Sequence, residues 1–475
     1  MKIAFLHYHL KPGGVTTVIR QQVESLAGQA EMLVLTGAAP PEPLSVQTAV
    51  ISGIGYDTPA QTASGKSNSA NQTAEEIIRA IREKWPGGCD LLHVHNPLLA
   101  KNCRLLSILS HLQQHGIRLL LQVHDFAEDG RPASYYDAGT PYPENCHYCV
   151  INSRDQAILR RAGLVEEGLH PLPNMVNPFN LQPEKTLAET FVLYPIRAIR
   201  RKNIGEAVLL SLFFPPPARL AITLPPNSPR DQAPYESWRA FVNAYQLPVV
   251  FEAAKHYDFS DLVKSAENLI TTSITEGFGF AFLEPWTAGQ FLAGRKLPDI
   301  CIDFENNGLQ LEHLYERLNV SLTNFEENRF FERWQACLQK NAGRFGIKMD
   351  SQTIRARYRA MTQNCGIDFG LLDEPFQQQV ISMMLTDKAV YQEIQKNNPA
   401  LNHLADISDR SARIAANRAA VLAAYNGTAY QSRLLNIYQR VMDTTVSHRI
   451  NKTRLASEFL HPETFSLLKW NEEGL

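Results

Sequence analysis

The chain has 475 residues, more than a single hydrophobic core usually organises, so two or three domains are expected. Its 44% apolar and 20% charged residues are typical of an ordinary soluble globular protein, and its net charge of −2 favours neither nucleic acid nor an anionic membrane as the main partner. Seven cysteines, an odd number, argue against a disulfide framework. No run of about 18 apolar residues predicts an integral membrane segment, and the N-terminal MKIAFLHYHL turns polar too quickly for a signal peptide. The composition therefore favours a cytoplasmic protein.

The first part of the chain alternates short apolar segments with segments of helical periodicity. The expected strands are residues 2–7, 31–35, 90–95, 117–125 and 149–153, and the expected helices include residues 15–26, 73–85 and 99–115. Strands that alternate with helices indicate a parallel sheet covered on both faces. Residues 1–175 are therefore predicted to form a doubly wound, Rossmann-like α/β domain.

A segment rich in proline and asparagine, residues 172–190, is predicted to link this domain to a second one. The alternation then restarts. Its expected strands are residues 191–197, 218–224, 248–253, 268–273 and 300–303, and its expected helices are residues 203–214, 235–246, 258–266 and 279–289. Residues 190–325 are predicted to form a second Rossmann-like domain that faces the first across a cleft.

Beyond about residue 325 the strand signal fades, and residues 330–475 are predicted to form a helical extension. A helix over residues 410–425 is expected to end at Asn426-Gly427. The next helix carries one apolar stripe, made of Tyr430, Leu434, Ile437, Tyr438 and Val441. This stripe could support a homo-oligomer or could brace the two domains.

Residues 57–75 are polar and low in complexity, and they are predicted to form a loop. The SGKS within this segment resembles the end of a phosphate-binding P-loop. Ala60, however, stands where that motif requires its first glycine, and the segment does not directly follow a strand. A P-loop is therefore not expected.

Two glutamates stand eight residues apart in TSITEGFGFAFLEPW (272–286), among glycines and large apolar residues. Glu276 is expected in the loop after a strand, at the carboxyl edge of the sheet, where open α/β sheets bind ligands. Gly277 and Gly279 would let a ligand approach the backbone, and the following helix would offer free N–H groups to an anion. Glu284 would repel a phosphate and should instead accept hydrogen bonds from hydroxyls. A ligand that combines phosphate and polyol is a sugar nucleotide.

The pattern E-G-F-G-x-x-x-L-E resembles the E-x7-E signature of retaining GT-B glycosyltransferases, family 4 in particular. Other parts of that family's pattern follow in the right order, at residues 6–19, 91–96, 122–125, 197–202 and 286–300. The resemblance covers residues 1–300. It departs from the family at QFLAGRKLP, which lacks the usual proline, and at residues 306–318, so it leaves the acceptor and the subfamily open.

The resemblance implies a set of donor-binding residues. Arg197 and Lys202 would neutralise the donor diphosphate, and Gly13 and Gly14 would present backbone N–H groups to it from the first domain. Glu284 would bind the ribose hydroxyls of the nucleotide. The sugar of the donor would be held by Glu276 together with the backbone of Gly277, Phe278 and Gly279. His124 would lie near the C6 hydroxyl of that sugar and its reacting carbon.

The resemblance also implies a reaction. A hexose would pass from a UDP-, GDP- or ADP-linked donor to a hydroxyl acceptor with retention of anomeric configuration, by front-face attack in which the departing phosphate takes the proton. Neither an enzymic nucleophile, nor a metal, nor a cofactor would be needed, and the sequence has no D-x-D motif. One alternative is a non-catalytic sugar-nucleotide-binding or assembly protein. A nicotinamide-dependent oxidoreductase is disfavoured, because HLKPGGV lacks the G-x-G-x-x-G fingerprint and Thr36 stands where an acidic residue should end the second strand.

Two further groups of residues have competing interpretations. Cys146 and Cys149 could form half of a zinc site, but no second ligand pair is evident, so two thiols at the start of a strand are preferred. His93 and His95 are expected to point to opposite faces of their strand, so that at most one of them faces the cleft.

Overall fold

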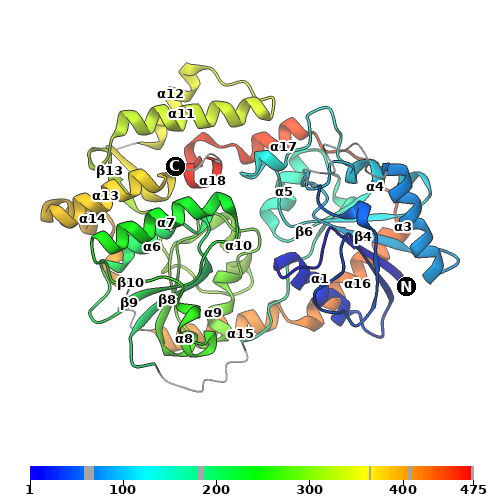
Figure 1. The fold of residues 1–475 in the computed structure, drawn as a ribbon, viewed down its shortest axis with the longest axis horizontal. Coiled ribbons are helices and arrows are strands. Elements are labelled where there is room, and N and C mark those ends of the chain that lie inside the picture. The colour runs from blue at the N-terminus through cyan, green and yellow to red at the C-terminus, as the bar shows by residue number, and fades with distance from the viewer. Residues whose placement is uncertain (58–68, 180–186, 363–364, 405–408, 472–475) are drawn as a thin grey trace. The chain divides into compact units, whose positions relative to one another are not determined.

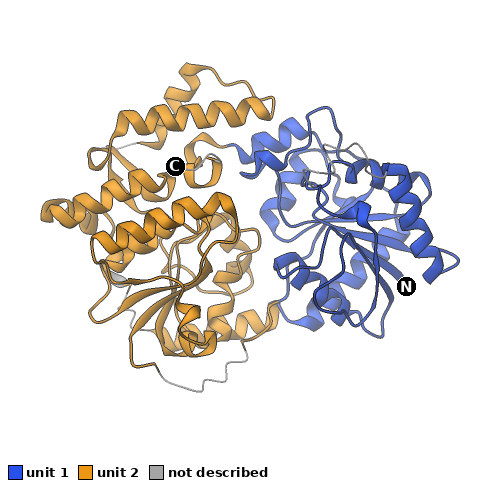
Figure 2. Cartoon of the chain, viewed as in Figure 1, with its two compact units in different colours: residues 1–175, 425–460 blue, residues 176–424, 461–475 orange. Residues whose placement is uncertain are grey.

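The computed structural model describes residues 1–57, 69–179, 187–362, 365–404 and 409–471. The chain forms two compact units (Figure 2). Unit 1 comprises Met1–Met175 and Tyr425–Leu460, and unit 2 comprises Val176–Ala424 and His461–Leu475. Much of the expected polar loop, including SGKS, and part of the expected linker lie outside the described residues. Within the described ranges, no helix is long and apolar enough to cross a membrane.

Unit 1 is built on a seven-stranded parallel sheet with the order β3-β2-β1-β4-β5-β6-β7. The strands are β1 (Lys2–His7), β2 (Glu31–Thr36), β3 (Gln47–Val50), β4 (Leu91–His95), β5 (Leu119–Val123), β6 (His147–Val150) and β7 (Leu169–Pro171). The central strands are buried along nearly their whole length, as expected for a parallel sheet that is covered on both faces.

Helices cover both faces of this sheet. Alternate residues of β1 belong to two separate cores, Ala4 and Leu6 to one and Ile3 and Phe5 to the other, because successive side chains of a strand point to opposite faces. The first core is completed by α3 (Ala70–Lys84), α4 (Leu105–Gln114), α5 (Ser153–Arg161) and α17 (Lys452–Phe459). The second core is completed by α1 (Gly14–Ser25) and α16 (Gly427–Asp443).

The apolar stripe of α16 lies in the second core of unit 1. Tyr430, Leu434, Ile437, Tyr438 and Val441 are all buried there, and α16 packs beside α1 (Figure 1). The stripe is therefore part of the interior of unit 1 and does not offer a surface to a second copy of the chain.

Unit 2 contains a five-stranded parallel sheet with the order β10-β9-β8-β11-β12. Its strands are β8 (Phe191–Arg197), β9 (Arg219–Leu224), β10 (Val249–Val250), β11 (Ala266–Thr271) and β12 (Leu292–Gly294). The helices that follow the strands are α6 (Ile204–Ser211), α7 (Pro229–Ala244), α8 (Phe259–Ser265), α9 (Glu284–Thr287) and α10 (Pro298–Asn306). Both units thus have the doubly wound α/β architecture that the sequence predicts.

One predicted strand of unit 2 is wrong. Residues 300–303 lie in α10, and the strand at this edge of the sheet is β12. Pro298 at the first position of the helix and Asp299 in its first turn both favour a helix start. Ile300, Cys301 and Phe304 are buried at helical spacing. The short apolar run ICID fits the periodicity of a strand as well as that of a helix. Pro298, at the first helical position, favours the helix.

The predicted helical extension is divided between the two units. After β12 the chain forms a small antiparallel pair, β13 (Asn319–Ser321) and β14 (Gly366–Asp368). The other helices of unit 2 are α11 (Glu327–Arg344), α12 (Ser351–Met361), α13 (Glu374–Thr386), α14 (Lys388–Asn397), α15 (Arg410–Ala424) and α18 (Leu467–Trp470). Residues 425–460 instead return to unit 1, because the stripe of α16 needs a sheet face to cover it.

A buried lysine fastens α17 to the loop before β6. The Lys452 ammonium donates hydrogen bonds to the carbonyls of Tyr136 and Asp137, both at 2.8 Å, and of Thr140 at 3.1 Å. It also lies 4.3 Å from the ring centroid of Tyr135 and 4.8 Å from that of Tyr142. Burial lowers the pKa of Lys452 to about 8. The ammonium thus serves as a structural donor to three carbonyls of one loop.

We expect Lys452→Met to lower the free energy of unfolding by about 1–3 kcal/mol, because the buried carbonyls lose their donor and methionine cannot replace it. Urea unfolding measures the change. Lys84→Met, which removes a half-exposed lysine at the end of α3, is the matched control and should cost far less. Equal losses in the two variants would contradict a structural role for Lys452.

Candidate functional site

The loop that carries Lys202 is tied to the carboxyl end of β11. It follows β8 as a 3-10 turn, Arg200–Lys202, and ends at Asn203, whose φ is 50°. Tyr194 Oη donates to the Lys202 carbonyl at 2.8 Å, and Thr272 Oγ1 donates to the carbonyls of Lys202 and Asn203, both at 3.0 Å. The Ile274 N–H donates to the Arg201 carbonyl at 3.0 Å. The backbone of Lys202 is therefore fixed at the edge of the sheet where ligands bind in open α/β folds.

Lys202 and Glu276 form an ion pair within this edge. The ammonium of Lys202 donates to Glu276 Oε1, and the two side chains are only 15% and 10% exposed. Burial alone would raise the pKa of Glu276, but the charges of Lys202 and Arg201 and hydrogen bonds from Lys202 and Ser273 outweigh it, so the pKa lies below its usual value. Glu276 is thus ionised at neutral pH.

Glu284 lies near the same lysine but in a different electrostatic state. Burial raises the pKa of Glu284 to about 7, although the charge of Lys202 opposes the shift. The predicted helix over residues 279–289 is wrong: the chain forms a 3-10 turn, Phe280–Phe282, and then the four-residue helix α9, Glu284–Thr287. Pro285 has no N–H to continue a hydrogen-bond ladder through this point. The segment therefore lacks the long helix whose free N–H groups were expected to face an anion.

Packing explains two of the residues between the glutamates, Gly279 and Phe278. Gly279 has φ +92°, and a Cβ there would meet Ile300 Cγ2 at 3.0 Å and Phe282 Cδ2 at 3.1 Å, so only glycine fits. Phe278 is buried, with its ring centroid 4.9 Å from that of Phe280 and 5.9 Å from that of Phe304. The Phe278 side chain therefore serves the core, and only its backbone can serve a ligand.

Arg197 was predicted to act with Lys202, but its hydrogen-bond partner is a different one from Glu276. It is exposed at the end of β8, and its Nη1 donates to the Pro225 carbonyl at 2.9 Å. The register of β8 on β9 shifts between Tyr194 and Arg197, around Pro195, which has no N–H for the ladder. Arg197 thus stands at the rim of the sheet edge.

The two arginines next to Lys202 take opposite roles. Arg200 is buried and forms a double hydrogen bond with the Glu374 carboxylate at 2.6 and 2.7 Å, so it fixes the loop to α13. Arg201 is half-buried, its charge helps to lower the pKa of Glu276, and its Nε has no hydrogen-bond partner among the described residues. Arg201 is therefore a candidate site residue that the sequence did not single out, because RAIRRK does not show which arginine lies beside Glu276.

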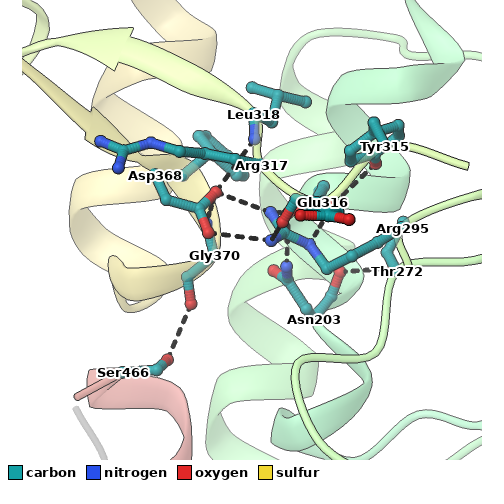
Figure 3. A network of polar contacts seen from close by, with 12 residues as sticks. Asn203, Thr272, Arg295, Tyr315, Glu316, Arg317, Leu318, Asp368, Gly370 and Ser466 are labelled. Carbon is teal, nitrogen blue, oxygen red and sulfur yellow. Dashed lines mark hydrogen bonds and ion pairs between the residues drawn. The ribbon is translucent and has the colours of Figure 1, made fainter. Parts of the chain in front are cut away.

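A network of buried charges around Arg295 reaches Asn203, the residue after Lys202 (Figure 3). The Arg295 guanidinium bonds to both oxygens of Glu206 at 2.8 and 2.6 Å and to both oxygens of Asp368 at 2.8 and 2.7 Å. Glu206 also accepts from Tyr315 Oη at 2.7 Å and from Asn203 Nδ2 at 2.7 Å. Since Asn203 closes the Lys202 loop, the network connects β12 and β14 to the site.

Unit 1 contributes the predicted glycine turn. Gly13 precedes α1 in extended backbone, and Gly14 begins the helix. Both glycines are exposed, a Cβ on Gly14 would meet nothing within 4 Å, and one on Gly13 would meet only the Lys11 carbonyl at 3.9 Å. The fold itself therefore does not need glycine at either position, and close approach of a ligand to the backbone would be a reason for it.

His124 follows β5 at the carboxyl edge of the unit 1 sheet. It is 7% exposed, its backbone N–H donates to Asn96 Oδ1 at 2.9 Å, and its ring Nε2 lies 3.0 Å from Nδ1 of His95. Burial lowers the pKa of His124 to about 4. The expectation that His93 and His95 point to opposite faces is wrong: their rings stack with centroids 4.5 Å apart, because residues two apart on a strand share a face.

The two cysteines considered for zinc do not share a ligand site. Cys146 lies in the core on one face of the unit 1 sheet and Cys149 in the core on the other face. Burial raises the pKa of both thiols well above the usual value, which keeps them protonated. The described part of the chain contains no group of three or more histidine, cysteine or acidic side chains placed to hold a metal ion.

Comparison with known proteins agrees with this architecture. No protein-family model matches the chain. A mannosylglucosyl-3-phosphoglycerate synthase from Petrotoga mobilis is 27% identical over 379 residues, which cover 70% of this chain and 72% of that protein. The structure of HepE from Anabaena in complex with UDP and glucose is 12% identical, covers 92% of this chain and 99% of its own, and superposes with a TM-score of 0.53. Sucrose-phosphate synthase from Thermosynechococcus elongatus is 15% identical, with coverages of 92% and 98% and a TM-score of 0.51.

The fold is therefore that of the GT-B glycosyltransferases, with two doubly wound units and a C-terminal helical region. The chain is a glycosyltransferase similar to family 4, an enzyme of the hexosyltransferase class.

We expect Arg295→Met to lower the free energy of unfolding by about 3–5 kcal/mol, because it leaves two carboxylates, Glu206 and Asp368, buried without their cation. Urea unfolding measures the loss. The control is Arg329→Met, which breaks an exposed ion pair with Glu326 and should change stability little. Similar stabilities of the two variants would show that the network does not hold unit 2 together.

The pKa of Glu284 predicts a pH dependence of donor binding. If its carboxylate accepts hydrogen bonds from ribose hydroxyls, affinity for the nucleotide sugar should rise as pH rises through about 7, where Glu284 loses its proton. Calorimetric titration between pH 5.5 and about 8.5 tests this across the usual carboxyl and histidine range. In Glu284→Gln the rise should disappear, and an identical pH profile in both proteins would assign the titration to another group.

Proposed function

We propose that the chain is a retaining glycosyltransferase that moves a hexose from a nucleoside-diphosphate sugar to a hydroxyl acceptor, without a metal or another cofactor. The observation that carries the proposal is the Lys202–Glu276 ion pair beside Glu284 at the carboxyl edge of the unit 2 sheet. One cation and two carboxyl groups, one with a lowered pKa and one with a raised pKa, suit a ligand that has both a diphosphate and hydroxyls.

The ion pair gives each partner a defined part in the reaction. Lys202, which already pairs with Glu276, also binds the donor diphosphate. Its ammonium stabilises the negative charge that develops on the leaving phosphate. Arg201, and Arg197 at the rim, add positive charge on the same loop. Glu276, already ionised, accepts hydrogen bonds from hydroxyls of the donor sugar, and Glu284 accepts them from the ribose. We propose that the backbone of Gly277 to Gly279 also binds the donor, and that the backbone of Gly13 and Gly14 in unit 1 does so as well.

The departing phosphate takes the proton of the acceptor hydroxyl in this proposal, as the new bond forms on the same face of the sugar. No side chain then has to act as a nucleophile. This agrees with His124, whose low pKa keeps it uncharged at neutral pH and suits it to hydrogen bonding with the sugar and not to carrying charge.

The name of the Petrotoga relative suggests an acceptor class. That protein is named for a product in which sugars are joined to 3-phosphoglycerate. We propose that a small, soluble, anionic sugar–glycerate compound is the acceptor here as well, in a cytoplasmic reaction.

Thermal unfolding in the presence of UDP, GDP, ADP and their glucose and mannose conjugates tests the donor site first. A ligand present at a hundred times its dissociation constant adds about 2.7 kcal/mol to the free energy of unfolding. We expect one nucleotide series to stabilise the protein, and Lys202→Ala to weaken that effect. Stabilisation by none of them, or an unchanged effect in Lys202→Ala, would contradict the assignment of the site.

Transfer assays with the stabilising donor then test catalysis. Glu276→Gln should lower kcat by orders of magnitude, while nucleotide binding is largely kept, because the lost charge acts on the sugar. Glu267→Gln, an exposed glutamate on β11, is the control and should leave kcat unchanged. Activity should survive EDTA, and the product anomer, followed by NMR, should match the donor. Nucleotide binding without transfer to any acceptor would favour a sugar-nucleotide-binding protein instead.

A further inference from the structure

Two histidines at neighbouring strand ends of unit 1 form a stacked pair. His95 ends β4 and His124 follows β5, and their rings lie nearly parallel, at 13°, with centroids 5.3 Å apart. His95 Nδ1 and His124 Nε2 are 3.0 Å apart, which is a hydrogen-bond distance. His95 is completely buried and His124 nearly so. The two imidazoles therefore share one hydrogen bond that is shielded from bulk water.

Other residues hold His95 in this position. The His93 ring stacks on its other side, and His93 Nδ1 lies 2.9 Å from Tyr438 Oη of α16. His7 Nδ1 lies 3.3 Å from the His95 carbonyl. His95 is thus in contact with two other imidazoles, and its ring cannot turn without disturbing a buried layer that includes α16.

The hydrogen bond between the pair has only two possible directions. Burial lowers the pKa of both rings, that of His95 well below its usual value and that of His124 to about 4, so both are neutral at pH 7. A neutral imidazole has one N–H and one lone pair. Either His95 donates from Nδ1 to His124 Nε2, or His124 donates from Nε2 to His95 Nδ1.

The surroundings of His95 distinguish these two directions of the hydrogen bond. Its other nitrogen, Nε2, is buried and has no hydrogen-bond partner among the described residues. If His124 were the donor, His95 would carry its proton on that nitrogen, and a buried N–H would be left without an acceptor. Orphaned buried donors are rarer than orphaned acceptors. His95 therefore carries its proton on Nδ1 and donates it to His124.

We infer that His95 is a positioning residue that fixes His124 as the tautomer with its proton on Nδ1. His124 Nδ1 makes no hydrogen bond with any described residue, so its N–H remains for a ligand oxygen. The role of His124 rests on the proposed function. In that reaction His124 is a hydrogen-bond donor to a hydroxyl or phosphate oxygen and is not a general base.

Nitrogen-15 NMR of the ligand-free protein, labelled in its histidines, tests the tautomer directly. Two-bond proton–nitrogen correlations distinguish Nδ1–H from Nε2–H, and His124→Gln identifies the signals of His124. We expect a protonated Nδ1 and a hydrogen-bonded, unprotonated Nε2 on His124 at pH 7. A proton on Nε2, or on both nitrogens, would overturn the inference. This result does not depend on activity, so failure of the proposed function would leave it readable.

Two substitutions test whether His95 is responsible. His95→Asn places an amide donor near the position of Nδ1 and should keep the His124 signals, whereas His95→Leu should move the Nε2 signal to that of an unbonded nitrogen or mix the tautomers. His170→Leu is the matched control, because His170 forms another stacked pair in unit 1, with His147. It should leave His124 unchanged.

The kcat of the two His95 variants provides a second test of the role of His95. We expect at least a tenfold lower kcat in His95→Leu, with most of it restored in His95→Asn, while nucleotide binding in unit 2 is kept in both. Unchanged His124 signals together with wild-type kcat in His95→Leu would show that His95 has no such role.

Discussion

The site in unit 2 depends on a guanidinium that has almost no contact with water. Arg295 lies between Glu206 and Asp368 and satisfies both carboxylates at once. Because an unpaired buried charge costs several kcal/mol, none of the three can move far alone. Glu206 also holds Asn203, and Asn203 is the residue after Lys202. The position of the lysine is thus set by an ion pair in the core, although the lysine itself lies on a surface loop.

The candidate site residues of the two units differ in their polar groups. In unit 2 the groups are charged, and Lys202 decides their states: it pairs with Glu276 and keeps it ionised, while burial leaves Glu284 close to half-protonated at neutral pH. In unit 1 the groups are uncharged, namely a neutral imidazole and the N–H groups at Gly13 and Gly14. The candidate residues of unit 2 therefore carry charge, whereas those of unit 1 can offer only hydrogen bonds.

Local sequence patterns were enough to predict the two doubly wound units, and the family resemblance assigned Lys202 and the E-x7-E segment to one donor site, but the ion pair between Lys202 and Glu276 was not predicted. They failed where contacts between residues far apart in the sequence determine the secondary structure or the packing. ICID could be a strand or a helix, and the division of the last helices between two units depends on which sheet face remains open. Nothing in RAIRRK shows that Arg200 turns into the core while Arg201 does not. The shared face of His93 and His95, in contrast, follows from strand periodicity alone and was available from the sequence.

The return of α16 and α17 to unit 1 has a consequence for how the protein is made. The sheet of unit 1 is complete once Met175 has left the ribosome, but the helices that finish both of its cores begin at Gly427 and Lys452. At about 5–20 residues per second, roughly 250 residues of unit 2 take on the order of 10–50 s to synthesise first. During that time the apolar residues that α16 will cover are not yet covered by it. A gene cut after residue 175 would leave the first unit permanently in that exposed state.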